Sequence, residues 1–164
     1  MPVRPFVPWP DKRLRTPAEP VGKVTDEIRA IWDDMIDTME AMPGVGLAAP
    51  QIGVMLRLAV VDCSTERGRA VRMADPEIMA AGPGTFDWEE GSPNLPGVSA
   101  RITRPNPVIV TFTDHHGMRT RQTFEDLWAT SVQHQIDHLN GMIYADRLSR
   151  TKRDMLLRRA RKGS

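Results

Sequence analysis

The stretch Gln133-His134-Gln135-Ile136-Asp137-His138 places two histidines four residues apart in a segment that reads as a helix. Residues at i and i+4 of a helix lie on one face, so both imidazoles can bind the same metal ion. A metallohydrolase helix of this type carries a glutamate directly after the first histidine, where it acts as the general base. Gln135 occupies that position, so the sequence indicates a metal-hydrolase helix whose base has been replaced.

The sequence around this stretch predicts an α+β fold. The histidine helix is expected to open at Thr123, with Asp126 three residues on as in a capping box, and to stop at Gly141. Thr25 is expected to cap an earlier helix that ends at Pro43 and Gly44. Between the two helices we expect strands over 57–62 and 70–74, a turn over 82–84, and a hairpin of 107–113 with 118–123.

One domain is expected over residues 1–164, with an irregular, proline-rich segment over 1–23 and a basic C-terminal helix within 146–164. The single Cys63 excludes an internal disulfide and fits a reducing compartment. No run of 18 apolar residues occurs, so we expect no membrane partner and a cytoplasmic location. The formal net charge of +1 gives no global attraction to nucleic acid.

Three separated segments together resemble the peptide deformylase family. Its motif G-x-G-x-A-A-x-Q matches Gly44 to Gln51, and its motif Q-H-E-x-D-H is matched at 133–138 apart from Gln135. Its motif E-G-C-L-S corresponds to Glu90-Gly91-Ser92-Pro93-Asn94. The resemblance spans nearly the whole chain and implies a compact fold with mixed β-sheets around a central helix that carries the histidine pair.

The resemblance also implies a reaction and a role for each matched position. The family removes formate from the N-formyl-methionine of new bacterial proteins, with iron or zinc held by a cysteine and two histidines. Carried over residue by residue, the metal ligands are Ser92, His134 and His138, and the catalytic positions are Gln135, Gln51 and Pro93. The substrate-binding positions are Gly44, Val45, Gly46, Glu90, Gly91 and Arg101.

Three of these positions depart from the family in ways that matter chemically. Ser92 offers a neutral hydroxyl where the family has a thiolate, so we expect Zn or Fe(II) to bind weakly or not at all. The amide of Gln135 cannot accept a proton at neutral pH. Pro93 has no N–H to stabilise an oxyanion. Hydrolysis is therefore expected to be impaired.

Two functions follow from this pattern. The first is a degenerate deformylase that binds a formylated peptide or nascent-chain N-terminus and contacts the ribosome or RNA through its basic C-terminal helix. The second is a metal-dependent amide hydrolase with altered ligands and low activity. A plainer alternative makes the basic segment a solvated helix face and gives Gly46 and Glu90 folding roles only, with Glu90 paired to a neighbour such as Arg101.

Overall fold

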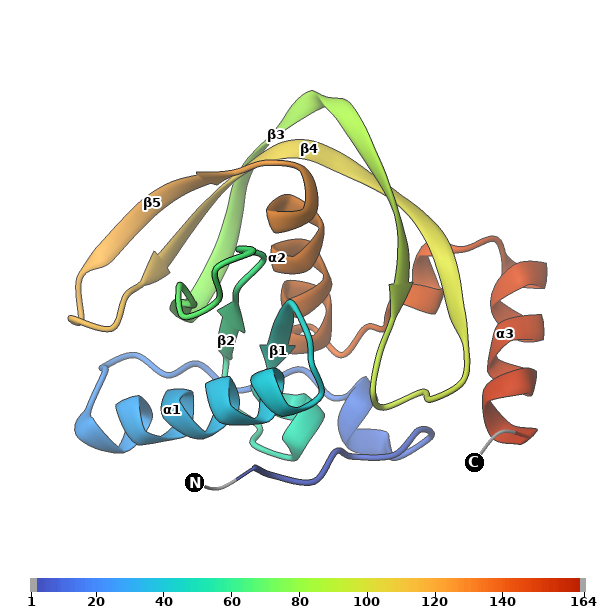
Figure 1. Cartoon of the computed structure of the whole chain (residues 1–164), viewed down its shortest axis with the longest axis horizontal. Coiled ribbons are helices and arrows are strands. Elements are labelled where there is room, and N and C mark those ends of the chain that lie inside the picture. Colours follow the sequence, from blue (N-terminus) through green and yellow to red (C-terminus); the bar gives the residue numbers. More distant parts are fainter. Residues whose placement is uncertain (1–2, 163–164) are drawn as a thin grey trace.

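The structure is a computed structural model that describes residues 3–162. Five strands form one sheet in the order β1 (Gly46–Ala48), β2 (Leu58–Val61), β3 (Val71–Gly91), β4 (Ser99–Thr113) and β5 (Arg119–Phe124). Figure 1 shows β3 and β4 arching over helix α2 (Asp126–Leu139), with helix α1 (Asp26–Ala41) below and helix α3 (Arg150–Lys162) set apart near the C-terminus. Short 3₁₀ helices lie at Lys12–Arg15, Ala49–Ile52 and Tyr144–Arg147.

The α+β class is confirmed, but the sheet is not mixed. All four pairings between neighbouring strands are antiparallel. Among residues 3–162, parallel pairing is limited to one isolated bridge between Glu19 and Leu56. Each strand follows its neighbour in chain order, and a parallel pair would need a long crossover connection that these segments lack.

Two apolar clusters hold α2 and α1 against the sheet. Below the sheet, Trp32, Met35 and Met39 of α1 are fully buried and pack against β1 and β2. The methionines expected at helical spacing therefore serve as core. The second cluster packs one face of β2 to β5 onto α2 and contains Val61, Met73, Val108, Val110, Phe112, Phe124, Ala129, Val132 and Ile136. The histidine helix is thus enclosed by the sheet along its length.

The turn predicted over 82–84 is wrong, because β3 continues through it to Gly91. The pairing of β3 with β4 instead shifts register between Ala81 and Gly84. A Cβ on Gly82 would lie 2.5 Å from Pro107 Cδ, and one on Gly84 would lie 2.8 Å from the Asn106 carbonyl oxygen. These glycines therefore allow two strand backbones to approach closely at a bulge.

The start of α2 also differs from the prediction. Thr123 belongs to β5, and the helix begins at Asp126 with Glu125 as N-cap. The Asp126 N–H donates to Asn106 Oδ1 at 2.9 Å. A side chain of β4 therefore caps the start of α2, where the sequence predicts a capping box formed within the helix itself. By contrast, Thr25 caps α1 as predicted, since its hydroxyl accepts from the Ile28 N–H at 3.3 Å.

The ends of the chain agree with the sequence in outline. Residues 3–23 contain one 3₁₀ helix and otherwise run without regular structure. The basic C-terminal helix begins at Arg150, after a 3₁₀ turn that includes Asp146, while 163 and 164 lie outside the described residues. Within residues 3–162, every helix is too short or too polar to cross a membrane.

Candidate functional site

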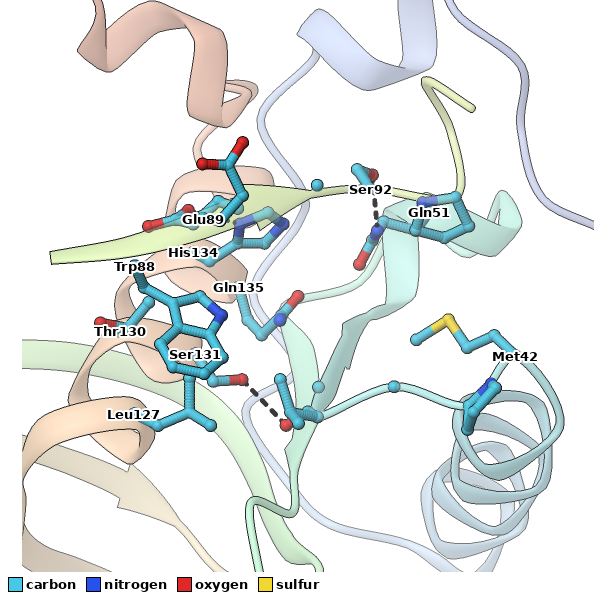
Figure 2. A pocket seen from close by; sticks show the side chains of 17 residues that line it. Met42, Gln51, Trp88, Glu89, Ser92, Leu127, Thr130, Ser131, His134 and Gln135 are labelled. Atoms are coloured by element: carbon cyan, nitrogen blue, oxygen red, sulfur yellow. Dashed lines mark hydrogen bonds and ion pairs between the residues drawn. The ribbon is translucent and has the colours of Figure 1, made fainter. Parts of the chain in front are cut away.

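A cavity of about 350 Å³ lies where α2 faces the end of β3 and the segment before β1 (Figure 2). The segment before β1 contributes its apolar side chains and glycines, and β3 contributes its last residues. Helix α2 contributes one face. The lining residues are Met42, Pro43, Gly44, Val45, Gly46, Gln51, Trp88, Glu89, Glu90, Gly91, Ser92, Pro93, Leu127, Thr130, Ser131, His134 and Gln135.

The cavity brings together all three sequence motifs. Every predicted substrate-binding position except Arg101 lines it, and so do Ser92, Pro93, Gln51, His134 and Gln135. His138 is fully buried just behind, with its Nε2 atom 3.2 Å from Nε2 of His134. Apart from Arg101, the residues that the resemblance assigned to one site therefore line or adjoin one cavity.

Arg101 is not at this cavity. Its side chain is 68% exposed and reaches Asp87 at 3.4 Å. It lines a separate groove against α3 instead. The suggested pair of Glu90 with Arg101 is also wrong, because Glu90 is paired with Arg104. Positions 101 and 104 differ by three residues along β4, so their side chains point to opposite faces of the sheet.

Arg104 links the cavity to the base of α2. Its guanidinium is 2% exposed and donates to both oxygens of Glu90, at 2.7 and 2.9 Å, and to Asp137 at 3.0 Å. Asp137 also accepts two hydrogen bonds from Arg147, at 3.0 and 2.5 Å. Burial acts to raise the pKa of Glu90, but hydrogen bonds from His134 and Arg104 outweigh it and hold that pKa below its usual value. Glu90 is therefore ionised at neutral pH.

The ionised Glu90 sets the state of the histidine pair. His134 Nδ1 lies 2.9 Å from Glu90 Oε1 and must donate to it. Burial, and then the charges of His134 and Arg104, lower the pKa of His138 well below its usual value, so this ring is neutral. The neutral His138 and His134 share a hydrogen bond through their Nε2 atoms, which lie 3.2 Å apart. One proton thus lies between the two nitrogens that would face a shared ligand.

The donor set does not fit a catalytic zinc or iron site. Such a site uses three strong protein ligands and one open position. Two imidazoles converge here, but the third position is the hydroxyl of Ser92. In the described part of the chain, no three His, Cys, Asp or Glu side chains are grouped to hold a metal. Cys63 does not replace the missing thiolate, because burial raises its pKa to about 12 and it does not line the cavity.

Ser92 is held instead in a buried amide hub, which we define as Gln51, Ser92 and Asn94. Gln51 Nε2 donates to Asn94 Oδ1 at 2.8 Å and to Ser92 Oγ at 3.3 Å. The Ser92 hydroxyl donates to Asn94 Oδ1 at 3.0 Å. Asn94 Nδ2 donates in turn to the carbonyl oxygens of Val7 and Gln51. Figure 2 shows Ser92 and Gln51 joined at one side of the cavity, across from His134.

Gln135 reaches the same cavity from α2. Its side chain is buried, and its Oε1 atom has no hydrogen-bond partner among residues 3–162. A Cβ on Gly46 would lie 2.5 Å from Gln135 Nε2 and 2.4 Å from Ser131 Oγ. Position 46 must therefore be glycine for Gln135 to occupy this place. Gly46 therefore has a packing role: it leaves space for the side chains of Gln135 and Ser131 on α2.

Sequence reasoning missed Arg104 and Asn94 as site residues. Asn94 closes the segment 90–94 that matches a family motif, and Arg104 lies three residues after Arg101. An arginine on an inward-facing position of a strand is the signal that would have found Arg104, since a buried guanidinium requires buried acids. Asn94 carries no such signal, because apart from the nearby Ser92 its side-chain partners, Val7 and Gln51, come from two distant segments.

Comparison with known proteins places this chain in a family. A family model described as "Polypeptide deformylase" matches residues 3–154. A peptide deformylase of Methylocella silvestris is 40% identical over all of this chain and 86% of its own length. A "Peptide deformylase-like" protein of Bradyrhizobium diazoefficiens is 41% identical over all of this chain and 96% of its own. A crystal structure of peptide deformylase from Ehrlichia chaffeensis superposes with a TM-score of 0.92 at 33% identity, covering 99% of this chain and 97% of that one. The chain belongs to the peptide deformylase family.

Proposed function

We propose that the chain keeps the peptide pocket of its family but hydrolyses formyl-peptides weakly or not at all, and acts by binding peptide N-termini. The observation that carries this proposal is the amide hub. Ser92 stands at the family's cysteine position, and its hydroxyl donates to Asn94 while it accepts from Gln51. A neutral hydroxyl already committed to two amides is a poor metal ligand.

The other two departures remove further parts of the same reaction. Loss of a general base such as the glutamate replaced by Gln135 lowers the rate by roughly 10²–10⁴. Loss of one oxyanion donor, as at Pro93, lowers kcat by roughly 10²–10³. These factors do not multiply simply, because the groups act as a unit. Each departure alone accounts for a severe defect.

The rest of the cavity supports peptide binding. Its apolar lining, from Met42, Val45, Trp88 and Leu127, suits an apolar side chain of a ligand. The buried ion pairs of Arg104 keep the end of β3 fixed against α2. Concave, largely preformed pockets with a few polar groups are the usual form of a small-ligand site. The pocket is therefore built to hold a ligand without a hydrolytic centre.

The direct test measures formate release from formyl-Met-Ala-Ser by the purified protein, with and without added Zn²⁺ or Fe²⁺. We expect turnover at least about 100-fold below that of an active family member assayed in parallel. Binding of Met-initiated peptides, followed by calorimetry, is expected to persist. Ordinary enzyme rates would refute the proposal.

A second candidate is a working amide hydrolase of low activity. Two observations favour it: the two imidazole Nε2 atoms lie 3.2 Å apart, and relatives about 40% identical are named peptide deformylase. Elemental analysis after dialysis against a chelator separates the candidates. Stoichiometric metal would favour the hydrolase, and a folded, metal-free protein would favour the binding protein.

For partners and location, we propose what the sequence suggests. The exposed basic residues of α3, among them Arg150, Lys152 and Arg158, offer a surface for phosphates of ribosomal RNA in the cytoplasm. Cosedimentation with ribosomes at two salt concentrations tests this. We expect binding that weakens as salt rises and that is lost when these residues are changed to glutamine.

A further inference from the structure

The side-chain donors of Gln51 and Ser92, the two members of the amide hub that line the cavity, are already used. Gln51 Nε2 donates to Asn94 and Ser92, and the Ser92 hydroxyl donates to Asn94. Pro93 has no N–H to offer. A carbonyl oxygen placed beside these residues would find no free donor from these three positions, and burying an acceptor without a partner is unfavourable.

An acceptor on the α2 side of the cavity remains available. Gln135 Oε1 is buried at the cavity and has no partner within the described residues. An unpaired buried acceptor gains from a ligand that brings a donor. The lining therefore combines an open acceptor at Gln135 with an amide hub whose donors are committed, while the hydroxyl of Thr130, also without a partner in the described chain, can donate or accept.

The charges of the lining agree with this. Two carboxylates, Glu89 and Glu90, line the cavity, and no lysine or arginine is among its lining residues in the described chain. Glu90 is matched by the buried Arg104. Glu89 is exposed and accepts from the Ser99 hydroxyl at 2.7 Å, and it forms none of the ion pairs found in residues 3–162. A ligand with a positive charge is favoured here.

We infer that the pocket prefers peptides with a free N-terminal amine to formylated ones. The inference rests on the proposed function, that the cavity binds peptide N-termini, and names which N-termini. An α-amino group has a pKa of about 7.7–8.0, so at neutral pH it is largely a cation with three donors. It can donate to Gln135 Oε1 and lie in the field of Glu89, while the first side chain enters the apolar part of the cavity. A formyl group removes this charge and puts an acceptor in its place.

The test compares Met-Ala-Ser with formyl-Met-Ala-Ser by titration calorimetry on the full chain, with EDTA present. We expect the free peptide to bind at least about tenfold more tightly, the effect of one charge-assisted hydrogen bond. Equal or tighter binding of the formyl peptide would overturn the inference and leave the proposed function standing. Binding of neither peptide would overturn both. Binding that requires added Zn²⁺ would overturn the inference.

Variants locate the effect. Gln135→Met keeps the length of the side chain and removes the acceptor, so it should weaken the free peptide about tenfold and leave the formyl peptide unchanged. Glu89→Gln, on an exposed side chain that cannot endanger folding, should weaken only the free peptide and by less, because water screens it. The matched control is Leu127→Ala, which should weaken both peptides alike. A Gln135→Met variant that folds and keeps its preference for the free amine would refute the assignment.

Discussion

At the scale of single residues, Ser92, Pro93 and Gln135 come from two distant segments and line the same cavity. Compared with the family motifs, we propose to interpret each as a replacement that lacks the family's group: a hydroxyl for a thiolate, a proline ring for an N–H, and an amide for a carboxylate. The structure adds that the Ser92 hydroxyl accepts from Gln51 and donates to Asn94, which supports the proposal that it is a poor metal ligand. At Ser92, the weak ligand character of a hydroxyl and its hydrogen bonds to Gln51 and Asn94 support the same proposal.

Restoring the three groups together tests this reading. The variant Ser92→Cys, Pro93→Leu, Gln135→Glu regains a thiolate ligand, a backbone donor and a base. We expect formate release from formyl-Met-Ala-Ser at least about 100-fold above the parent, with little change in any single variant, because a base without a metal-bound water has nothing to deprotonate. Adding His138→Ala to the triple variant is the control and should abolish the gain. A folded, metal-loaded triple variant that stays inactive would contradict this account.

Arg104 supports a stability prediction at the same scale. Changing it to methionine keeps volume but leaves the carboxylates of Glu90 and Asp137 buried without it. Removing one partner of a buried ion pair typically destabilises by about 3–5 kcal/mol. Urea unfolding measures the loss. Arg101→Met is the matched control on the exposed side of β4, where a shift beyond about 1 kcal/mol would be unexpected.

At the scale of elements, the long β3–β4 ribbon determines where the cavity ends. Its register shift near Gly84 bends the ribbon over α2, and the last residues of β3 are thereby carried to the histidine pair. Asn106 lies beside the bulge and holds the first N–H of α2. The β3–β4 ribbon therefore contacts α2 at two places, through Asn106 at the start of the helix and through Glu90 at His134.

The bulge gives a prediction about glycine. A Cβ at Gly84 would lie 2.8 Å from the backbone oxygen of Asn106, so Gly84→Ala must shift one strand. We expect a loss of about 1–3 kcal/mol in the free energy of unfolding, as for other overpacked sites. Gly91→Ala is the control, because its nearest neighbour would lie at an ordinary 3.6 Å. Thermal unfolding of the two variants decides; equal midpoints would show that the bulge tolerates a side chain.

At the scale of the whole molecule, buried titratable groups make stability depend on pH. His138 has a folded-state pKa below its unfolded value of about 6.5, since burial disfavours the charged ring. Its contribution is therefore fully present above about pH 6.5 and is lost as the pH falls toward its folded pKa. Glu90 also has a lowered folded pKa, so its contribution is present above about pH 4.5 and is lost in more acidic solution.

The urea midpoint should accordingly fall in two stages as the pH drops, first below about pH 6.5 and again below about pH 4.5. In His138→Gln the first stage should flatten while the second remains. His116→Gln, an exposed histidine in the β4–β5 turn, is the control and should leave both stages in place. If the urea midpoint of His138→Gln still falls below about pH 6.5, another titrating group causes the first stage.

The sequence by itself determined the histidine helix, the cap of α1, the β4–β5 hairpin and the three positions, Ser92, Pro93 and Gln135, that depart from the family motifs. These features depend on local spacing and on the chemistry of single side chains. The family motifs also indicate which segments, although far apart in the sequence, belong to one site. The segments that line the cavity could be named for the same reason.

Only the tertiary structure decided which charges meet and which donors are used. Arg104 and Arg101 lie three residues apart on β4, so their side chains point to opposite faces of the sheet. The packing of β4 turns one face inward, which makes Arg104 a buried partner of Glu90 and leaves Arg101 exposed. The amide hub joins Gln51 to Asn94 across 43 positions, so no local pattern reveals it. The turn expected at Gly82 became a bulge because a neighbouring strand lies against it. Such features depend on competition among distant groups for one space, which a linear pattern does not encode.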